Sequence, residues 1–414
     1  MRSTTGGIII IIIFLLLDAY IYSVIRTLSV SHRTRLLVGI VYWGIAVLSI
    51  TGLLLFVYTS PEVMGRKIRT YLFSAIAMLF FAKLLAATFF LIDDIRRLFQ
   101  WGGSKLFLAD TAANPGNGQG ITRSSFLSWI GIAAGSGLLG TFLYGFRNQY
   151  NYTLVKQKIS FPNLPDEFKG FRILHISDIH SGTFMDQRAV SRGVDKIMAQ
   201  KADIILFTGD LVNDKASEME NYHRMFSQIS APMGVYSVLG NHDYGDYVSW
   251  PQDGLTKAQN LDKLKAVQAG MGWRLLMNEH VILKRGNAEI ALIGIENWSA
   301  KSRFPKHGKM EPAYRGCERY PFKILMSHDP SHWDAEIRSK YPDIDLMLSG
   351  HTHGMQFGVE IPGFKWSPIE YVYKQWAGLY EEGKQKLYVN RGFGCIGYPG
   401  RVGILPEITL IELV

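Results

Sequence analysis

Cysteine and charge are both scarce in this chain of 414 residues. Only two cysteines are present, Cys317 and Cys395, which excludes a disulfide framework and a cysteine-rich zinc module. Charged residues make up 19% of the chain, compared with the ~25% that is typical of soluble domains, and hydrophobic residues make up 48%. This composition disfavours a wholly soluble protein, and the aromatic content of 13% excludes a mainly disordered one.

The net charge of +9 is unevenly distributed along the chain. Residues 1–150 contain 13 Lys and Arg but only 5 Asp and Glu, whereas residues 151–414 contain 31 and 30. The basic excess therefore flanks the apolar segments of the first part, as in membrane proteins, and does not mark a face for nucleic acid. We expect no nucleic-acid partner.

Four long apolar stretches precede residue 150. Each is close to the ~20 residues that a helix needs to cross the hydrocarbon core of a bilayer. A signal peptide would explain the first stretch but not four of them. The sequence predicts a membrane region over residues 1–147 and hence a multi-pass protein of the cell membrane. The four predicted transmembrane helices cover residues 7–25, 36–58, 71–92 and 126–146.

Two charged residues, Asp18 and Lys83, fall inside these stretches. A charge within the membrane is costly unless it is paired or its side chain snorkels to the interface. The interpretations that stay open are an ion pair between the first and third helices, and snorkelling of the side chains or a shifted helix boundary.

The orientation of the helices is not given by charge, because Lys and Arg are balanced between the two sides of the membrane. After a Gly-, Asn- and Pro-rich loop at 110–120, the segment at 122–127 reads Thr-Arg-Ser-Ser-Phe-Leu. It is similar to a twin-arginine export signal that lacks one arginine. On that similarity we expect Arg123 in the cytoplasm and the domain that follows on the extracytoplasmic side.

The sequence pattern changes after the last apolar stretch. Residues 148–170 are predicted to be a linker to a second domain, residues 171–414. In that domain short apolar runs alternate with amphipathic segments such as residues 187–200 and 256–269, which indicates an α/β layered fold with sheets buried on both faces. In such folds, functional sites lie at the carboxyl ends of strands. The predicted strands cover residues 171–177, 203–208, 234–239, 289–295, 323–327, 345–349, 386–390 and 408–413.

Residue types that bind metals follow five of these strands. Five of the 11 histidines of the chain occupy these few positions, together with aspartates and one asparagine. Because alternate residues of an extended segment share a face, Asp-x-His and His-x-His can each turn two side chains toward one ion. The five segments are Asp178-Ile179-His180, Gly209-Asp210, Gly240-Asn241-His242-Asp243, His328-Asp329 and Gly350-His351-Thr352-His353.

The chemistry of these side chains indicates a site for two metal ions. The two carboxylate oxygens of Asp210 can bridge two ions, and Asn241 adds a neutral oxygen. Oxygen and nitrogen ligands without thiolate suit Mn, Fe or Zn ions. Two such divalent metal ions can lower the pKa of a shared water and neutralise the oxygens of a phosphoryl group. The sequence therefore predicts a dinuclear metal centre for phosphoryl chemistry.

In their order along the chain, these motifs resemble those of the calcineurin-like metallophosphoesterases: DxH, GD, GNHD, a lone His and GHTH. The resemblance covers about residues 171–414. The closing segment NRGFGCIGYPGRVGILPEITLIEL is similar to that of the membrane-associated bacterial branch of YkuE-like and YaeI-like phosphohydrolases. The resemblance implies a calcineurin-like four-layer αββα sandwich after the transmembrane α-helices, and an enzyme that hydrolyses phosphoric esters.

The resemblance also implies a role for each motif residue. Asp210 would bridge the two metals, and His242, oriented by Asp243, would donate a proton or hydrogen bond to an oxygen of the substrate. The chain departs from the family where a second acid often follows the GD motif, because Asn213 occupies that position. The remaining implied ligands are Asp178, His180 and His353 for one metal and Asn241, His328 and His351 for the other.

Several other residues carry weaker signals. His175 lies within a predicted strand and is expected in the core, and His332 is expected at the surface more than at a substrate. Arg391 and Arg401 flank a Gly-rich turn and fit either the mouth of the site or a structural salt bridge. Aromatic-rich loops at 244–250 and 357–366 fit either an apolar groove for a lipid tail or ordinary core packing.

The sequence therefore predicts a membrane-anchored, dinuclear metal-dependent phosphoesterase. It would hydrolyse a phosphomonoester or phosphodiester by attack of a metal-bridging hydroxide, and the membrane anchor suggests a lipid or lipid-linked substrate. The alternative within enzymes is a pyrophosphatase that acts on a nucleotide diphosphate-linked lipid precursor. A non-catalytic membrane sensor or scaffold is disfavoured because every expected ligand is present. The choice of metals and the oligomeric state stay open.

Overall fold

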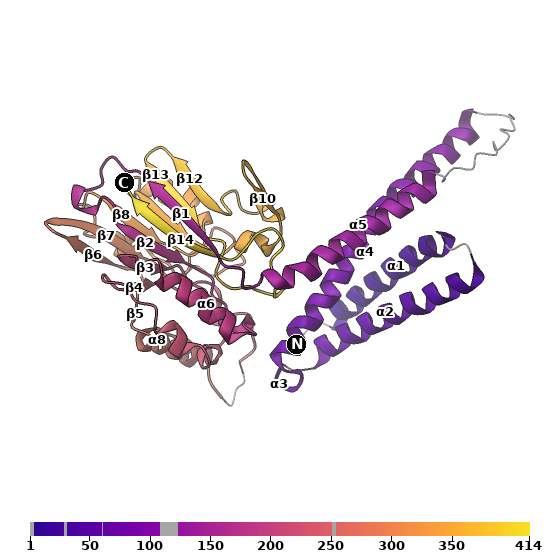
Figure 1. The fold of residues 1–414 in the computed structure, drawn as a ribbon, viewed down its shortest axis with the longest axis horizontal. Helices are drawn as coiled ribbons and strands as arrows, with labels where there is room; N and C mark the ends of the chain where they lie inside the picture. The colour runs from indigo at the N-terminus through magenta and orange to yellow at the C-terminus, as the bar shows by residue number, and fades with distance from the viewer. Residues whose placement is uncertain (1–3, 29–30, 60, 108–122, 251–253) are drawn as a thin grey trace. The chain divides into compact units, whose positions relative to one another are not determined.

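The computed structural model describes residues 4–28, 31–59, 61–107, 123–250 and 254–414 (Figure 1). These residues form two compact units, which divide between Tyr144 and Gly145. The loop predicted at 110–120 and the first residue of the segment similar to an export signal, Thr122, lie outside the described residues. Each unit is described by itself below.

The first unit consists of long apolar helices. All four cover the predicted stretches, and each is long and apolar enough to cross a membrane. Many of their large apolar side chains are exposed, as expected of helices that face lipid. The prediction of four transmembrane helices is confirmed. The helices are α1 (Thr4–Leu28), α2 (His32–Tyr58), α4 (Arg66–Phe107) and α5 (Arg123–Gly145), with a short α3 (Pro61–Met64) before α4.

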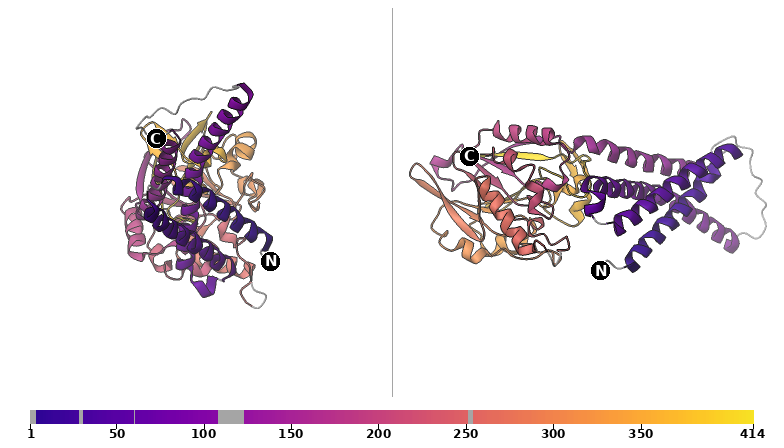
Figure 2. Two further views of the ribbon diagram at one scale, coloured as in Figure 1. Left: turned by 90° about the vertical axis from the view of Figure 1, so that its right-hand side faces the viewer. Right: turned by 90° about the horizontal axis from the view of Figure 1, so that it is seen from below.

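Small residues allow these helices to approach closely. Helix α1 packs against α2 and α4 (Figure 2). A Cβ atom added to Gly135 of α5 would lie 2.6 Å from the carbonyl oxygen of Ala82 in α4. Such close backbone contact is typical of helix packing in membranes, where van der Waals contact drives association.

The two charged residues within the membrane helices form an ion pair. Lys83 Nζ of α4 lies 2.5 Å from Asp18 Oδ1 of α1, and the hydroxyl of Tyr42 in α2 donates to the same oxygen at 2.8 Å. Asp18 is fully buried. The ion-pair interpretation is therefore confirmed, and this polar cluster joins three helices.

The second unit contains two six-stranded sheets. In the first sheet, β2, β3, β4 and β5 run parallel, and β14 is antiparallel to β2. In the second sheet, β7, β8, β9 and β13 run parallel, with β6 and β12 antiparallel at the edges. The first sheet has the order β1 (Thr153–Ile159), β14 (Glu407–Leu413), β2 (Arg172–Ile176), β3 (Ile204–Phe207), β4 (Val235–Ser237), β5 (Trp273–Leu275). The second has the order β12 (Gly378–Glu382), β13 (Gln385–Val389), β9 (Leu346–Ser349), β8 (Lys323–Met326), β7 (Ala288–Gly294), β6 (Glu279–Arg285).

Alternating strand residues build three apolar cores in this unit. Ile173 of β2 points into the core between the two sheets, whereas the next residue, Leu174, points toward helices on the outer face of the first sheet. A third core lies between the second sheet and its own helices. The four-layer αββα sandwich is thus confirmed (Figures 1 and 2). Its helices are α6 (Gln187–Met198), α7 (His223–Phe226) and α8 (Lys257–Gly270) on one side and α9 (Met310–Tyr314) and α10 (Arg338–Lys340) on the other.

All eight predicted strands are present, but the predicted linker is wrong in one respect. Residues 148–170 contain β1, which pairs in parallel with β14 and forms an edge of the first sheet. The range therefore belongs to the folded sheet and is not a free connection. A separate two-stranded hairpin, β10 (Val359–Ile361) and β11 (Phe364–Trp366), lies outside both sheets.

Candidate metal centre

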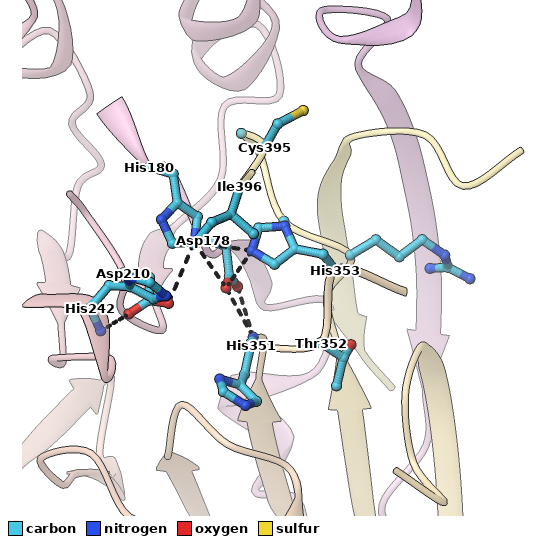
Figure 3. Close-up of polar contacts among 12 residues, drawn as sticks. Asp178, His180, Asp210, His242, His351, Thr352, His353, Cys395 and Ile396 are labelled. Carbon is cyan, nitrogen blue, oxygen red and sulfur yellow. Dashed lines mark hydrogen bonds and ion pairs between the residues drawn. The ribbon is translucent and has the colours of Figure 1, made fainter. Parts of the chain in front are cut away.

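The candidate site lies where the carboxyl ends of strands from both sheets meet. The predicted segments follow β2, β3 and β4 of the first sheet and β8 and β9 of the second. Within each sheet these strands run parallel, so their carboxyl ends share one edge of that sheet, and contacts between residues of the two sheets bring these edges together. Figure 3 shows Asp178, His180, Asp210 and His353 gathered at these edges, with the backbone of His351 beside Asp178.

One group of three side chains is formed by Asp178, His180 and His353, all of them buried. His353 Nε2 lies 3.2 Å from Asp178 Oδ1 and 3.0 Å from His180 Nε2. In Figure 3 the two rings and the carboxylate point toward each other. Two ring nitrogens and one carboxylate oxygen therefore surround a single point.

A second group is formed by Asp210, His328 and His351. His328 Nε2 lies 3.2 Å from Asp210 Oδ2 and 3.3 Å from His351 Nδ1. The same oxygen of Asp210 lies 3.5 Å from His180 Nε2 in the first group. Asp210 therefore stands between the two groups.

The backbone at these positions is strained. Five of the nine non-glycine residues with positive φ in the described chain are candidate ligands. Such conformations cost of the order of 1–3 kcal/mol each and persist only where the surrounding structure requires them. Their concentration here means that the fold holds the side chains in place at the expense of local backbone energy. The five are Asp178 (φ 52°), His180 (φ 45°), Asp210 (φ 60°), His351 (φ 71°) and His353 (φ 51°).

Two motif glycines leave room for the carboxylates. A Cβ atom at Gly350 would lie 2.1 Å from Asp178 Oδ2, and one at Gly240 would lie 2.2 Å from Asp210 Oδ1. No side chain fits at either position without displacing a candidate ligand. This is why glycine precedes both Asn241 and His351.

Burial and neighbouring charges set the protonation states of the site. Burial lowers the pKa of His180 and that of His353, because it disfavours the charged imidazolium. Burial opposes ionisation of Asp178, but the surrounding imidazoles, His353 first and then His328 and His180, together hold the pKa of the carboxyl well below its usual range. Burial likewise opposes the charged form of His328, yet the carboxylate of Asp210 raises the pKa of this ring to about 10. Metal binding at His328 would therefore displace a proton.

The donor set fits a pair of divalent metal ions. Asn241 Oδ1 is buried without a hydrogen-bond partner, while its Nδ2 donates to Tyr247 at 2.8 Å. His328 Nδ1 faces the carbonyl oxygen of Thr208 at 2.7 Å, which fixes the proton on Nδ1 and leaves Nε2 directed at Asp210. Oxygen and imidazole donors without thiolate match the expected Mn, Fe or Zn ions. The residues that would hold the ions are Asp178, His180, Asp210, Asn241, His328, His351 and His353.

Comparison with known proteins identifies the family. Residues 1–149 match the family described as "Probable Calcineurin-like phosphoesterase, transmembrane domain", and residues 171–355 match "Calcineurin-like phosphoesterase". The chain belongs to the calcineurin-like phosphoesterases. It carries the transmembrane domain of that family and is a membrane protein.

Relatives of this calcineurin-like phosphoesterase occur in vertebrates and bacteria. The chain is similar to the Danio rerio "Transmembrane protein with metallophosphoesterase domain", with 30% identity over 63% of this chain and 57% of the relative. It is also similar to the metallophosphoesterase YkuE of Bacillus subtilis (26% identity; 71% of this chain, 98% of YkuE). The Escherichia coli "Phosphodiesterase YaeI" is 28% identical over 64% of this chain and 88% of YaeI. The match thus spans little more than half of the vertebrate relative.

The expected role of Asp243 in this phosphoesterase is wrong. Its carboxylate accepts backbone N–H groups of Gly240 at 2.9 Å and of Asp210 and Leu211 at 2.9 and 2.8 Å. It therefore ties together the loops after β3 and β4 and does not orient His242. The ring of His242 is oriented instead by the carbonyl oxygen of Asn213, 2.8 Å from Nδ1.

Sequence reasoning missed one residue that supports the site, Tyr373, and left the role of Arg401 open. The hydroxyl of Tyr373 lies 2.8 Å from His351 Nε2 and 3.1 Å from Asp329 Oδ2, so it holds the His351 ring with Nδ1 toward His328. Arg401 is fully buried and donates to the carbonyl oxygens of His353 and Gly394. A buried arginine next to a Gly-rich turn is a weak sequence signal, and Tyr373 carried none.

The remaining singled-out residues have structural roles. His175 is buried and lies 2.9 Å from Thr208 Oγ1, as expected of a core residue. His332 is not at the surface: it is buried and its ring packs on Trp298 at 4.1 Å. Arg391 forms salt bridges with Glu407 and Glu360, which is the structural alternative for this residue.

A pocket opens over the candidate metal centre. Besides the candidate ligands and His242, its walls combine one cation, Arg303, and the polar Thr352 and Gln356 with a set of apolar and aromatic side chains. Phe304 contacts His351 edge-on, with ring centroids 4.8 Å apart. The apolar and aromatic members are Phe304, Met355, Ile369, Tyr373, Ile396 and Tyr398.

Proposed function

We propose that this protein is a membrane-anchored phosphoesterase that hydrolyses phosphoric ester bonds with two divalent metal ions. The observation that carries the proposal is the position of Asp210. One of its oxygens lies within 3.5 Å of ring nitrogens in both groups of candidate ligands. A carboxylate between two such groups is the arrangement expected of a bridging ligand.

Different residues of the chain would have different roles in the reaction. Bound ions would supply a nucleophile from water at neutral pH and neutralise charge on the phosphoryl oxygens. Asn241 and the two groups of candidate ligands would fix their positions. His242, with Nδ1 held by the carbonyl oxygen of Asn213, lines the pocket and would hold a proton for the departing oxygen. Arg303 adds a positive charge at the pocket wall for an anionic substrate.

For the substrate we propose a phosphomonoester or phosphodiester of a lipid or lipid-linked molecule. Two features support this class: the transmembrane helices of the first unit, and the apolar lining of the pocket around one cation. A phosphate group beside Arg303 and an apolar portion along Met355 and Ile369 fit this combination. The location of the domain on the extracytoplasmic side stays a prediction from the segment at 122–127.

The test is hydrolysis by the full chain in detergent micelles with added Mn²⁺. We expect chelator-sensitive cleavage of bis-p-nitrophenyl phosphate or p-nitrophenyl phosphate, and faster cleavage of phospholipids than of their water-soluble headgroup esters. Cleavage of a nucleotide diphosphate-linked lipid between its two phosphates would favour the pyrophosphatase alternative. A protein that binds no metal and cleaves none of these compounds contradicts the proposal.

Substitution of His242 by Ala separates metal binding from proton transfer. We expect bound metal to stay unchanged, because this residue belongs to neither group of candidate ligands. We expect kcat to fall by about 10²–10⁴-fold, the usual contribution of a general acid. Metal content by mass spectrometry and turnover of the aryl phosphate are the two measurements. His223→Ala in α7, away from the pocket lining, is the matched control, and equal turnover in both variants would remove the role of His242.

A further inference from the structure

Exposed apolar side chains of the second unit are concentrated in one short segment. Among its described residues, eight large apolar side chains are exposed, and six of them lie between residues 355 and 372. Scattered single exposures are normal on a soluble surface, but a cluster of this kind marks an interaction site. We call this cluster the rim surface. It consists of Met355, Val359, Ile361, Phe364, Tyr371 and Val372, which are 44–78% exposed.

The hairpin within the rim surface has one apolar face and one charged face. Val359 and Ile361 of β10 share one face with their partners in β11, Trp366 and Phe364, whereas Glu360 and Lys365 share the other. The two charged side chains are exposed, and each also binds the domain: Glu360 accepts a hydrogen bond from Arg391 Nε at 3.0 Å, and Lys365 Nζ donates to the carbonyl oxygen of Ala377 at 2.5 Å. On the apolar face Val359, Ile361 and Phe364 are exposed, and Trp366 is half-buried. A hairpin surrounded by water commonly packs its apolar face on the core.

The rim surface is attached to the end of a membrane span. The fourth candidate span ends at Asn148, and its last residues belong to the second unit. The N–H of Arg401 donates to the carbonyl oxygen of Gly145 at 2.9 Å, and the rings of Phe146 and Tyr398 are 5.2 Å apart.

The loop of residues 398–402, which includes Tyr398 and Arg401, also contacts the base of the hairpin. The N–H of Gly358 donates to the carbonyl oxygen of Val402 at 2.9 Å. The N–H of Val402 donates to the carbonyl oxygen of Gln356 at 2.8 Å. Gln356 Nε2 donates to the carbonyl oxygen of Tyr398 at 2.7 Å. Residues 398–402 therefore connect the end of the span with the rim surface, and Figure 1 shows β10 at the end of this unit where the chain enters it.

We propose that the rim surface contacts the bilayer in which the protein's own helices lie. Its occupant is lipid, because the segment that anchors it leaves the membrane next to it and because its six exposed side chains are large and apolar. Insertion of Ile361 and Phe364 among the lipid chains would bury apolar area that is otherwise in water. Met355 also lines the pocket, so the apolar surface continues from the bilayer contact to the site. The inference does not depend on the proposed reaction, because it concerns the surface alone.

A fluorescent label tests the position of the hairpin. The full chain with Ile361→Cys is labelled with an NBD fluorophore and reconstituted into phosphatidylcholine–phosphatidylglycerol vesicles. The two native cysteines are buried, which directs the label to the new site. We expect blue-shifted emission and loss of most of the emission in vesicles whose lipids carry a spin label on the acyl chain near the headgroup. Tyr371→Cys on η8 (Pro368–Tyr371) is expected to behave in the same way.

The control carries the label in the turn between β6 and β7, away from the rim surface. Asn287, in the turn between β6 and β7, is exposed, and Figure 1 shows that turn far from β10 within this unit. The label at Asn287→Cys should be quenched by aqueous iodide and not by spin-labelled lipid. If the label at 361 responds like the label at 287, the proposal is overturned. Blue-shifted emission at 361 without quenching by lipid would assign the surface to a protein partner or a second copy, and would overturn it equally.

Discussion

Asp210→Asn is expected to lower turnover by at least about 100-fold, since loss of even the outer partners of a metal site typically costs 10–100-fold. The amide keeps the shape of the carboxylate, and its oxygen can still accept the N–H of His242, which lies 2.9 Å from Asp210 Oδ1 in the native chain. What it loses is the negative charge and the second oxygen ligand between His180 and His328. The fold should therefore survive while both groups of candidate ligands lose metal.

Two measurements check this result together. Metal content per chain should fall in the purified variant, and the Mn²⁺ concentration that restores half of the remaining activity should rise. Asp195→Asn, the same change at an exposed position of α6, is the control for the chemistry of the substitution. Near-normal turnover with two ions per chain in Asp210→Asn would show that this carboxylate does not bridge.

The strand ends were predictable because two independent signals coincide there. Apolar runs such as 203–208 define buried parallel strands, and the residues after them are of types that are rarely buried without a partner. The structure brings Asp178, His180 and His353 into contact, although His180 and His353 are 173 residues apart in the sequence. Ordered motifs at the ends of parallel strands specify such a meeting point without any knowledge of the loops.

The partners that orient these side chains were not predictable in the same way. His328 is held by the carbonyl oxygen of Thr208, and His242 by that of Asn213. A backbone oxygen is present at every residue, so its use leaves no mark on the sequence. The acidic side chain next to His242 suggested a pair, but the left-handed turn at Asp210 brings backbone N–H groups to Asp243 instead.

Elements at the periphery were missed for a related reason. Strand β1 lies at the edge of the first sheet, and its sequence contains the charged residues Lys156 and Lys158. Charged side chains are typical of edge strands, because they prevent pairing with a strand of another molecule. Its partner β14 lies at the other end of the chain, so pairing could not be inferred locally. The hairpin β10–β11 has an alternating pattern, which specifies a strand but not which face turns to the domain. For residues 357–366, core packing was an open alternative, and the exposure of Ile361 and Phe364 excludes it for these two side chains.

Lys83→Met is expected to destabilise the membrane unit by about 3 kcal/mol or more, the usual cost of removing one partner of a buried ion pair. The substitution leaves the fully buried Asp18 with only the hydroxyl of Tyr42. Because Asp18, Tyr42 and Lys83 come from α1, α2 and α4, the loss loosens three helices at once. The midpoint of thermal unfolding in detergent micelles, together with the yield of folded protein from the membrane fraction, measures the effect.

The exchanged pair distinguishes a specific ion pair from general sensitivity at these positions. Asp18→Lys combined with Lys83→Asp places opposite charges at the same two positions, and should recover stability that either single exchange loses. Lys67→Met, at an exposed position of the same helix α4, should leave the unfolding midpoint unchanged. A double exchange that is no more stable than its single parents would mean that the 2.5 Å contact contributes no coupling energy. Recovery, by contrast, requires that the two charges act on each other inside the membrane, where an unpaired charge has no water to solvate it.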